Sequence, residues 1–206
     1  MSSCLTVDCL CIAMGNVWSK NNILNEESVQ TYAELTYLTK NQIQYIAKLL
    51  DSIEPGILCE DLQHRFSTDQ IETVFPEIRC SPFRDSIYRV FSSKNDRHLS
   101  LEDVLDLCSA FSENADDDTR AAWAFSIFDF DGDNQISIDD LIEATQRLTR
   151  NDQDDPAVID REEAEHVARM VLQEMVFTQI GSISSEEFIR FVSRIPEFLS
   201  TFRFRI

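Results

Sequence analysis

The chain has 206 residues, 43% of them apolar, which is enough for the buried core of a small one- or two-lobed protein. Its formal net charge of −19 argues against a protein that binds nucleic acid or attaches to membranes through a basic patch. Four glycines and five prolines leave little material for β-turns, and no apolar run approaches the ~20 residues of a transmembrane helix. Composition therefore predicts an acidic, mostly helical protein.

Residues 1–24 precede every repeated pattern, and we expect a flexible extension there. Met14-Gly15, followed by Ser19, matches the pattern for N-myristoylation, which requires translation to start at Met14. In a chain that begins at Met1, palmitoylation of nearby thiols is the corresponding possibility, and an unmodified leader is the alternative to both. The thiols are Cys4, Cys9 and Cys11.

A short unit recurs four times further along the chain: an apolar residue, then Ser, then an acid or amide three places later. The Ser and its partner form a capping box that starts a helix. The apolar residue falls where an EF-hand loop makes a short β-contact with a paired loop. The units are Phe66-Ser67 with Gln70, Leu99-Ser100 with Asp103, Ile136-Ser137 with Asp140, and Ile183-Ser184 with Glu187. Their serial recurrence predicts an all-α EF-hand protein of four helix–loop–helix units in two pairs, at 25–112 and 117–194.

The best-formed loop is the third, residues 129–140, which reads Asp-Phe-Asp-Gly-Asp-Asn-Gln-Ile-Ser-Ile-Asp-Asp. A hard divalent cation needs several oxygens that converge at about 2.3–2.6 Å for calcium, supplied by a short turning loop. Apolar helical patterns on both sides disfavour the alternative, a solvated acidic loop. Ser137 would contribute directly or through water. The predicted ligands are Asp129, Asp131, Asp133, the carbonyl of Gln135, and Asp140.

Two places in the third loop depart from the strongest pattern. The sixth place, where the chain turns with positive φ, holds Asn134, the next best residue after Gly. The twelfth holds Asp140, whose shorter side chain reaches an ion less easily with both oxygens than Glu would. We therefore expect modest calcium affinity and a site that Mg²⁺ can also occupy.

The other three loops lack most ligands, so we expect one ion per chain. The first loop, residues 59–70, keeps Asp61 as its carboxylate at a ligand place. The second loop, residues 92–103, places Lys94 at the third place and keeps Asp96 and Asp103. In the fourth loop, residues 176–187, Glu187 stands alone, because the first, third and fifth places hold Val176, Thr178 and Ile180.

The segment 195–206 forms an apolar C-terminal tail. Pro196 cannot continue the preceding helix without a kink, so a new segment begins there. Burial of its aromatic rings would contribute a few kcal/mol at roughly 25 cal/mol per Å². We predict that the tail lies in a hydrophobic groove of its own chain and competes with a partner helix; the alternative is an ordinary part of the core.

No arrangement of residues typical of an enzyme is present, and the protein is predicted not to be one. The sequence contains no P-loop, no Gly-x-Ser-x-Gly motif and no His-rich motif. Cys59, Cys80 and Cys108 show no paired spacing, and we expect buried, free thiols.

Six stretches of the sequence are typical of one known protein family: 35–39, 81–87, 89–92, 124–125, 127–130 and 196–202. On these stretches the chain resembles the calcium and integrin-binding (CIB) protein family over residues 16–206, and its last five residues look most like those of members 2 and 3. A third loop that ends in Asp is typical of that family. The fourth loop departs from it, because the better-known members keep an aspartate-rich loop there.

Paired EF-hands commonly leave a groove that accepts an amphipathic helix, and the acidic surplus favours a partner rich in Lys and Arg. The resemblance implies a cytoplasmic segment of a membrane protein as partner: an integrin α-subunit tail, or a transmembrane channel-like subunit of a mechanotransduction complex. It also implies a cytoplasmic protein at the plasma membrane, held by its partner or by N-terminal acylation. We predict a constitutive adaptor or regulatory subunit; the alternative is a calcium sensor that switches conformation to regulate a soluble enzyme such as a kinase or phosphatase.

Overall fold

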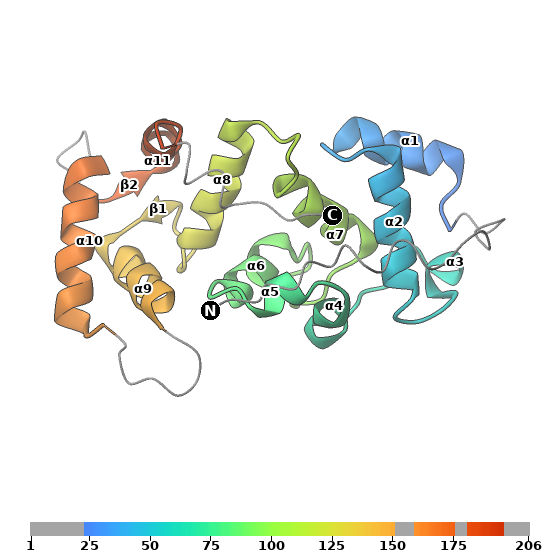
Figure 1. Ribbon diagram of the computed structural model, residues 1–206, viewed down its shortest axis with the longest axis horizontal. Coiled ribbons are helices and arrows are strands. Elements are labelled where there is room, and N and C mark those ends of the chain that lie inside the picture. Colours follow the sequence, from blue (N-terminus) through green and yellow to red (C-terminus); the bar gives the residue numbers. More distant parts are fainter. Residues whose placement is uncertain (1–22, 151–158, 176–180, 196–206) are drawn as a thin grey trace, which may run out of the picture.

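The computed structural model describes residues 23–150, 159–175 and 181–195. These residues form eleven helices and two short strands, which confirms the predicted all-α EF-hand class. The molecule is elongated, with α1 (Glu26–Leu35) at one end and α10 (Arg161–Met175) at the other, as Figure 1 shows. Among the described residues, no helix is both long and apolar enough to cross a membrane.

Helix α2 (Lys40–Asp51) packs against α1 and begins the N-terminal half of the core. It starts at Thr39, whose side chain forms a capping box with Gln42. Its apolar residues at helical spacing are fully buried, so this face of the helix belongs to the core. They are Ile43, Ile46, Ala47 and Leu50.

The first hand has an interrupted entering helix. After α2 ends, the chain turns at Gly56, which has a φ of 90°, and only the single turn α3 (Ile57–Glu60) precedes the loop. Pro55 has no N–H to donate at this turn. The N–H of the next residue, Gly56, donates to the carboxylate of Asp51 at 3.1 Å. The exiting helix α4 (Thr68–Val74) starts at the predicted capping box of Ser67 and Gln70.

The second hand follows a short connecting helix, α5 (Pro76–Arg79). Its entering helix is α6 (Arg84–Phe91), and its exiting helix α7 (Leu101–Ala110) starts at the capping box of Ser100 and Asp103. An antiparallel bridge between Phe66 and Leu99 joins the first and second loops, as predicted from their apolar eighth places.

The third and fourth hands form the other pair. Helices α8 (Asp117–Phe128) and α9 (Ile138–Thr149) flank the third loop, while α10 and α11 (Ser185–Val192) flank the fourth. Strand β1 (Gln135–Ile136) pairs antiparallel with β2 (Ile183–Ser184), so that Ile136 lies opposite Ile183. The capping boxes predicted at the starts of α9 and α11 are both present.

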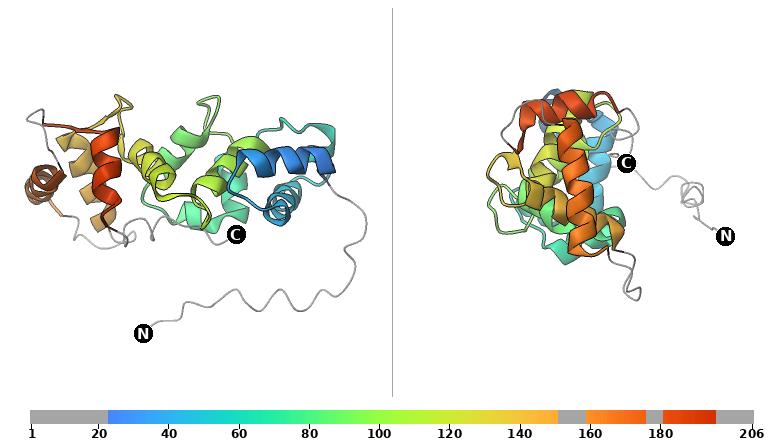
Figure 2. Two further views of the ribbon diagram at one scale, coloured as in Figure 1. Left: turned by 90° about the horizontal axis from the view of Figure 1, so that it is seen from above. Right: turned by 90° about the vertical axis from the view of Figure 1, so that its left-hand side faces the viewer.

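The two pairs of hands share one continuous hydrophobic core. Helix α8 of the third hand contacts α6 and α7 of the second hand, and Figure 2 shows the two pairs following one another along the long axis. Aromatic contacts across the junction include an edge-on pair, Phe83 and Phe128, at 5.0 Å between ring centroids and a stacked pair, Phe91 and Trp123, at 4.6 Å. The division into lobes at 25–112 and 117–194 stays a prediction.

The expectation of three buried thiols is wrong at two positions. Cys108 is buried in α7, and burial raises its pKa well above the usual range. Cys59 and Cys80 are exposed because they lie in or beside the short helices α3 and α5, each only one turn long. The N-terminal extension, the tail from Pro196 onward, and the first five places of the fourth loop lie outside the described residues.

Candidate metal centre in the third hand

The third loop turns back on itself at two left-handed residues. Gly132, at the fourth place, has a φ of 77°, and Asn134, at the sixth, has a φ of 63°. The second value confirms the prediction that Asn134 replaces Gly in the turning conformation. The turn exposes a row of backbone N–H groups to the side chains at the start of the loop.

Asp129 is the side chain that organises this turn. One of its oxygens, Oδ1, accepts the N–H groups of Gly132 at 2.8 Å and Asp133 at 3.2 Å. The other, Oδ2, accepts the N–H of Asn134 at 3.0 Å. The residue is 5% exposed, and its position at the C-terminal end of α8 places it at the base of the loop.

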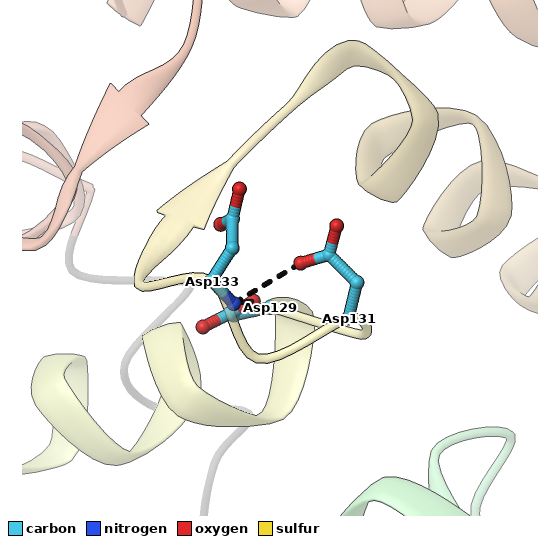
Figure 3. Close-up of side chains that lie close together, drawn as sticks. All are labelled: Asp129, Asp131 and Asp133. Atoms are coloured by element: carbon cyan, nitrogen blue, oxygen red, sulfur yellow. Dashed lines mark hydrogen bonds between the residues drawn. The ribbon is translucent and has the colours of Figure 1, made fainter.

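Asp131 and Asp133 complete a group of three carboxylates. Asp131 accepts the N–H of Asp133 at 3.2 Å, and Asp133 accepts the N–H of Gln135 at 2.8 Å, so each carboxylate bonds the backbone two residues later. One oxygen from each of the three aspartates lies within 4.8 Å of the others. Figure 3 shows the three side chains rising from one loop, with Asp131 accepting the Asp133 N–H.

The electrostatics of this group favour a bound cation. Burial raises the pKa of Asp129 above its usual range, and the nearby Asp140 carboxylate adds to this rise, whereas the three backbone N–H groups lower the pKa in part. Carboxylate oxygens held together without a cation repel one another, and hard oxygen ligands are those that Ca²⁺ and Mg²⁺ prefer. The three aspartates therefore fit a hard divalent ion.

The Asp140 carboxylate is not part of this group of three. Asp140 accepts the Phe130 N–H through Oδ1 at 3.0 Å, and Oδ2 accepts the Ser137 N–H at 2.8 Å and the Ser137 hydroxyl at 2.6 Å. The side chain of Gln135 accepts a hydrogen bond from the Ser182 hydroxyl. Coordination by Asp140 and by the Gln135 carbonyl stays a prediction.

Arg89 supports the base of the loop, and the sequence analysis did not single it out. Its Nη2 donates to the carbonyls of Ser126 at 3.0 Å and Asp129 at 2.6 Å, near the C-terminal end of α8. The last carbonyls of a helix lack partners within the helix, so a guanidinium there is favourable. Arg89 belongs to α6 of the second hand, and no local pattern indicates so distant a contact.

The chain belongs to the calcium and integrin-binding family. Member 3 of this family from Homo sapiens is 32% identical over 199 residues, which cover 94% of this chain and 100% of the relative. Member 2 from Drosophila melanogaster shows the same identity, length and coverage. Member 3 from Mus musculus is 42% identical over 131 residues, 64% of this chain and 78% of the relative. No family model matches the chain.

Proposed function

We propose that this protein is a non-enzymatic EF-hand adaptor or regulatory subunit that binds a divalent cation in its third hand. The observation that carries the proposal is the convergence of three aspartate oxygens within 4.8 Å on a loop with the expected left-handed turn. Membership of a family whose members are named for calcium binding supports the same conclusion.

The proposed site holds one ion per chain, either Ca²⁺ or Mg²⁺. Asp129, Asp131 and Asp133 supply the first three ligands, and the Gln135 carbonyl and Asp140 complete the set. Calcium takes six to eight oxygens in a flexible shell, whereas magnesium accepts a compact octahedron with retained water. A twelfth residue with a short side chain disfavours the larger shell, so magnesium competes at this site.

The proposed partner is an amphipathic cytoplasmic segment of a membrane protein. The relatives are named for integrin binding, which supports an integrin α-subunit tail; a subunit of a mechanotransduction channel is the second candidate. A net charge of −19 favours a segment rich in Lys and Arg. Attachment at the plasma membrane would then follow from the partner or from N-terminal acylation, which at Gly15 requires translation to start at Met14.

Calorimetric titration tests the metal site. Calcium should bind the unaltered chain at one strong site, and Asp129→Ala should weaken that site at least about 100-fold, because the remaining carboxylates would surround an under-ligated ion. Asp139→Ala is the matched control, since Asp139 lies beside Asp140 but is exposed and pairs with Arg161. Two strong sites in the unaltered chain, or an unchanged site in Asp129→Ala, would contradict the proposal.

The alternative is a calcium sensor that switches conformation to regulate a soluble enzyme. Amide spectra of the magnesium-loaded and calcium-loaded protein distinguish the two functions. Small differences confined to the third loop are expected for a constitutive adaptor. Shifts that spread through the helices of both pairs of hands would instead favour the sensor.

A further inference from the structure

The second loop has the backbone of an ion-holding loop although it lacks most of the ligands. Asn95, at the fourth place, has a φ of 53°, and Arg97, at the sixth, has a φ of 61°. Gly132 and Asn134 are left-handed at the same two places of the third loop. Left-handed backbone is uncommon for residues other than Gly and persists only where the surroundings hold it. Contacts around the second loop must therefore stabilise this turn.

Arg65 of the first loop reaches into the second loop. The bridge between the two loops positions it, because the Phe66 N–H donates to the Leu99 carbonyl at 2.9 Å and the Leu99 N–H donates back at 3.0 Å. Arg65 immediately precedes Phe66, so its side chain starts beside the turn of the second loop. That side chain is 13% exposed.

The guanidinium of Arg65 donates to the loop oxygens that would otherwise face an ion. Nη2 donates to the Ser92 hydroxyl at 3.1 Å and to the His98 carbonyl at 2.5 Å. Asp96 accepts from Nη2 at 2.7 Å and from Nε at 3.1 Å, and Asp103 accepts from Nη1 at 3.0 Å. These four residues occupy the first, seventh, fifth and twelfth places, which are ligand places in an EF-hand loop.

Charge and geometry both suit a guanidinium at this position. Its planar fork of N–H donors satisfies several oxygens at once, and it keeps its charge under all physiological conditions. The loop contributes two carboxylates at ligand places, Asp96 and Asp103, instead of the four of the third loop. The hydrogen bond from Arg65 is the largest cause that holds the pKa of Asp96 well below its usual range.

We propose that the Arg65 guanidinium is the resident cation of the second hand, and that it holds this loop in an ion-loaded geometry in the absence of calcium or magnesium. The second hand then needs no ion to keep its turn or its pairing with the first loop. A divalent ion at this loop would have to displace Arg65 and would also meet the positive charge of Lys94.

The test uses the full chain with Asp129→Ala, so that the third hand does not contribute binding. Lys94→Asp alone should bind no calcium, because Arg65 still occupies the loop. Lys94→Asp combined with Arg65→Ser should gain one calcium site by calorimetric titration. Calcium binding by Lys94→Asp with Arg65 intact, or no binding by the combined variant, would overturn the proposal.

Thermal unfolding supplies the second readout. In EDTA, Arg65→Ser should lower the melting temperature by on the order of 5–10 °C, because it leaves the buried Asp103 carboxylate unpaired. Arg161→Ser is the control and should lower it by less than about 2 °C, since Arg161 and Asp139 form an exposed pair. An equal effect of the two substitutions would contradict a resident cation.

Hydrogen exchange in the chain with Asp129→Ala and an intact Arg65 decides the matter even if Arg65→Ser does not fold, because calcium then cannot stabilise the shared core through the third hand. The amides of Phe66 and Leu99 should be protected to the same extent in EDTA and in calcium, because the cation that holds the second loop is part of the chain. Protection that rises tenfold or more with calcium would show that a free ion, not Arg65, completes this hand.

Discussion

The second and third loops share a backbone and differ in what faces their oxygens. Both are left-handed at the fourth and sixth places, and both lead into a helix capped by Ser and an aspartate. In the second loop, Arg65 donates to oxygens at four ligand places. In the third loop, oxygens of three aspartates lie close together, and the carboxylate of Asp129 accepts backbone N–H groups of the turn. The same turn can therefore be completed by a side chain or offered to a free ion.

We infer that the paired loop decides between these outcomes. Arg65 occupies the place before the bridging residue Phe66, and Ser182 occupies the equivalent place before Ile183. The Ser182 hydroxyl reaches the Gln135 side chain and brings no charge to the third loop. We infer that an arginine at this place fills the neighbouring loop with a side-chain cation, whereas a serine leaves the neighbouring loop to a free ion.

The largest effect is expected when an arginine is placed at the equivalent position of the other pair of hands. Ser182→Arg should weaken calcium binding at the third loop at least about 100-fold, because a positive charge near the three aspartates opposes a divalent ion. It should also raise the melting temperature in EDTA, since the guanidinium relieves the repulsion among those aspartates. Calorimetric titration and thermal unfolding measure the two effects.

Ser182→Gln is the matched control for Ser182→Arg. Its side chain is long and polar but uncharged, so calcium binding should be largely kept. If Gln and Arg weaken binding equally, bulk at position 182 is responsible, and the equivalence of Ser182 to Arg65 fails.

A smaller effect is expected at the twelfth place of the third loop. Asp140→Glu should raise calcium affinity about tenfold and raise the preference for calcium over magnesium, because a longer side chain reaches the ion with both oxygens. The capping box with Ser137 should survive, since Glu187 fills the same role after Ser184. Competition titrations with both ions measure the change; unaltered affinity and preference would show that this place does not limit the site.

Local patterns made much of the structure predictable from the sequence. The capping boxes and the apolar eighth places depend on residues three or four apart, and all four boxes and both loop pairings are present. The left-handed turn at Asn134 follows from the same register.

The contacts that sequence reasoning missed are long-range. Arg65 acts on a loop about 30 residues away, and Arg89 reaches the end of α8 from another hand, so nothing next to either residue in the sequence marks its role. Exposure of Cys59 and Cys80 was missed because it depends on how short helices sit at the surface. The interruption before α3 had a local signal, Pro55-Gly56, which the sequence analysis did not use.

The smallest expected effect is the acid dependence of the second loop. Arg65, followed by the His98 N–H and Ser92, holds the pKa of Asp96 below its usual range. A lowered pKa in the folded state gives stability that is fully present above the unfolded value of about 3.9 and is lost as the pH falls through the folded value. Asp96→Asn should therefore lower the melting temperature by a constant amount from about pH 7 to 5. The gap between the melting temperatures of the variant and the unaltered chain should begin to shrink below about pH 4 and should close only as the pH falls through the folded pKa of Asp96. The side chain of Asp96 is 42% exposed, so solvent screens the pair and the gap should be smaller than that for Arg65→Ser.

In an Arg65→Gln background, the same Asp96→Asn substitution should produce little difference in melting temperature at any pH. A gap that persists unchanged to pH 3, or that is as large without Arg65 as with it, would separate Asp96 from the guanidinium and leave the second loop without its proposed cation.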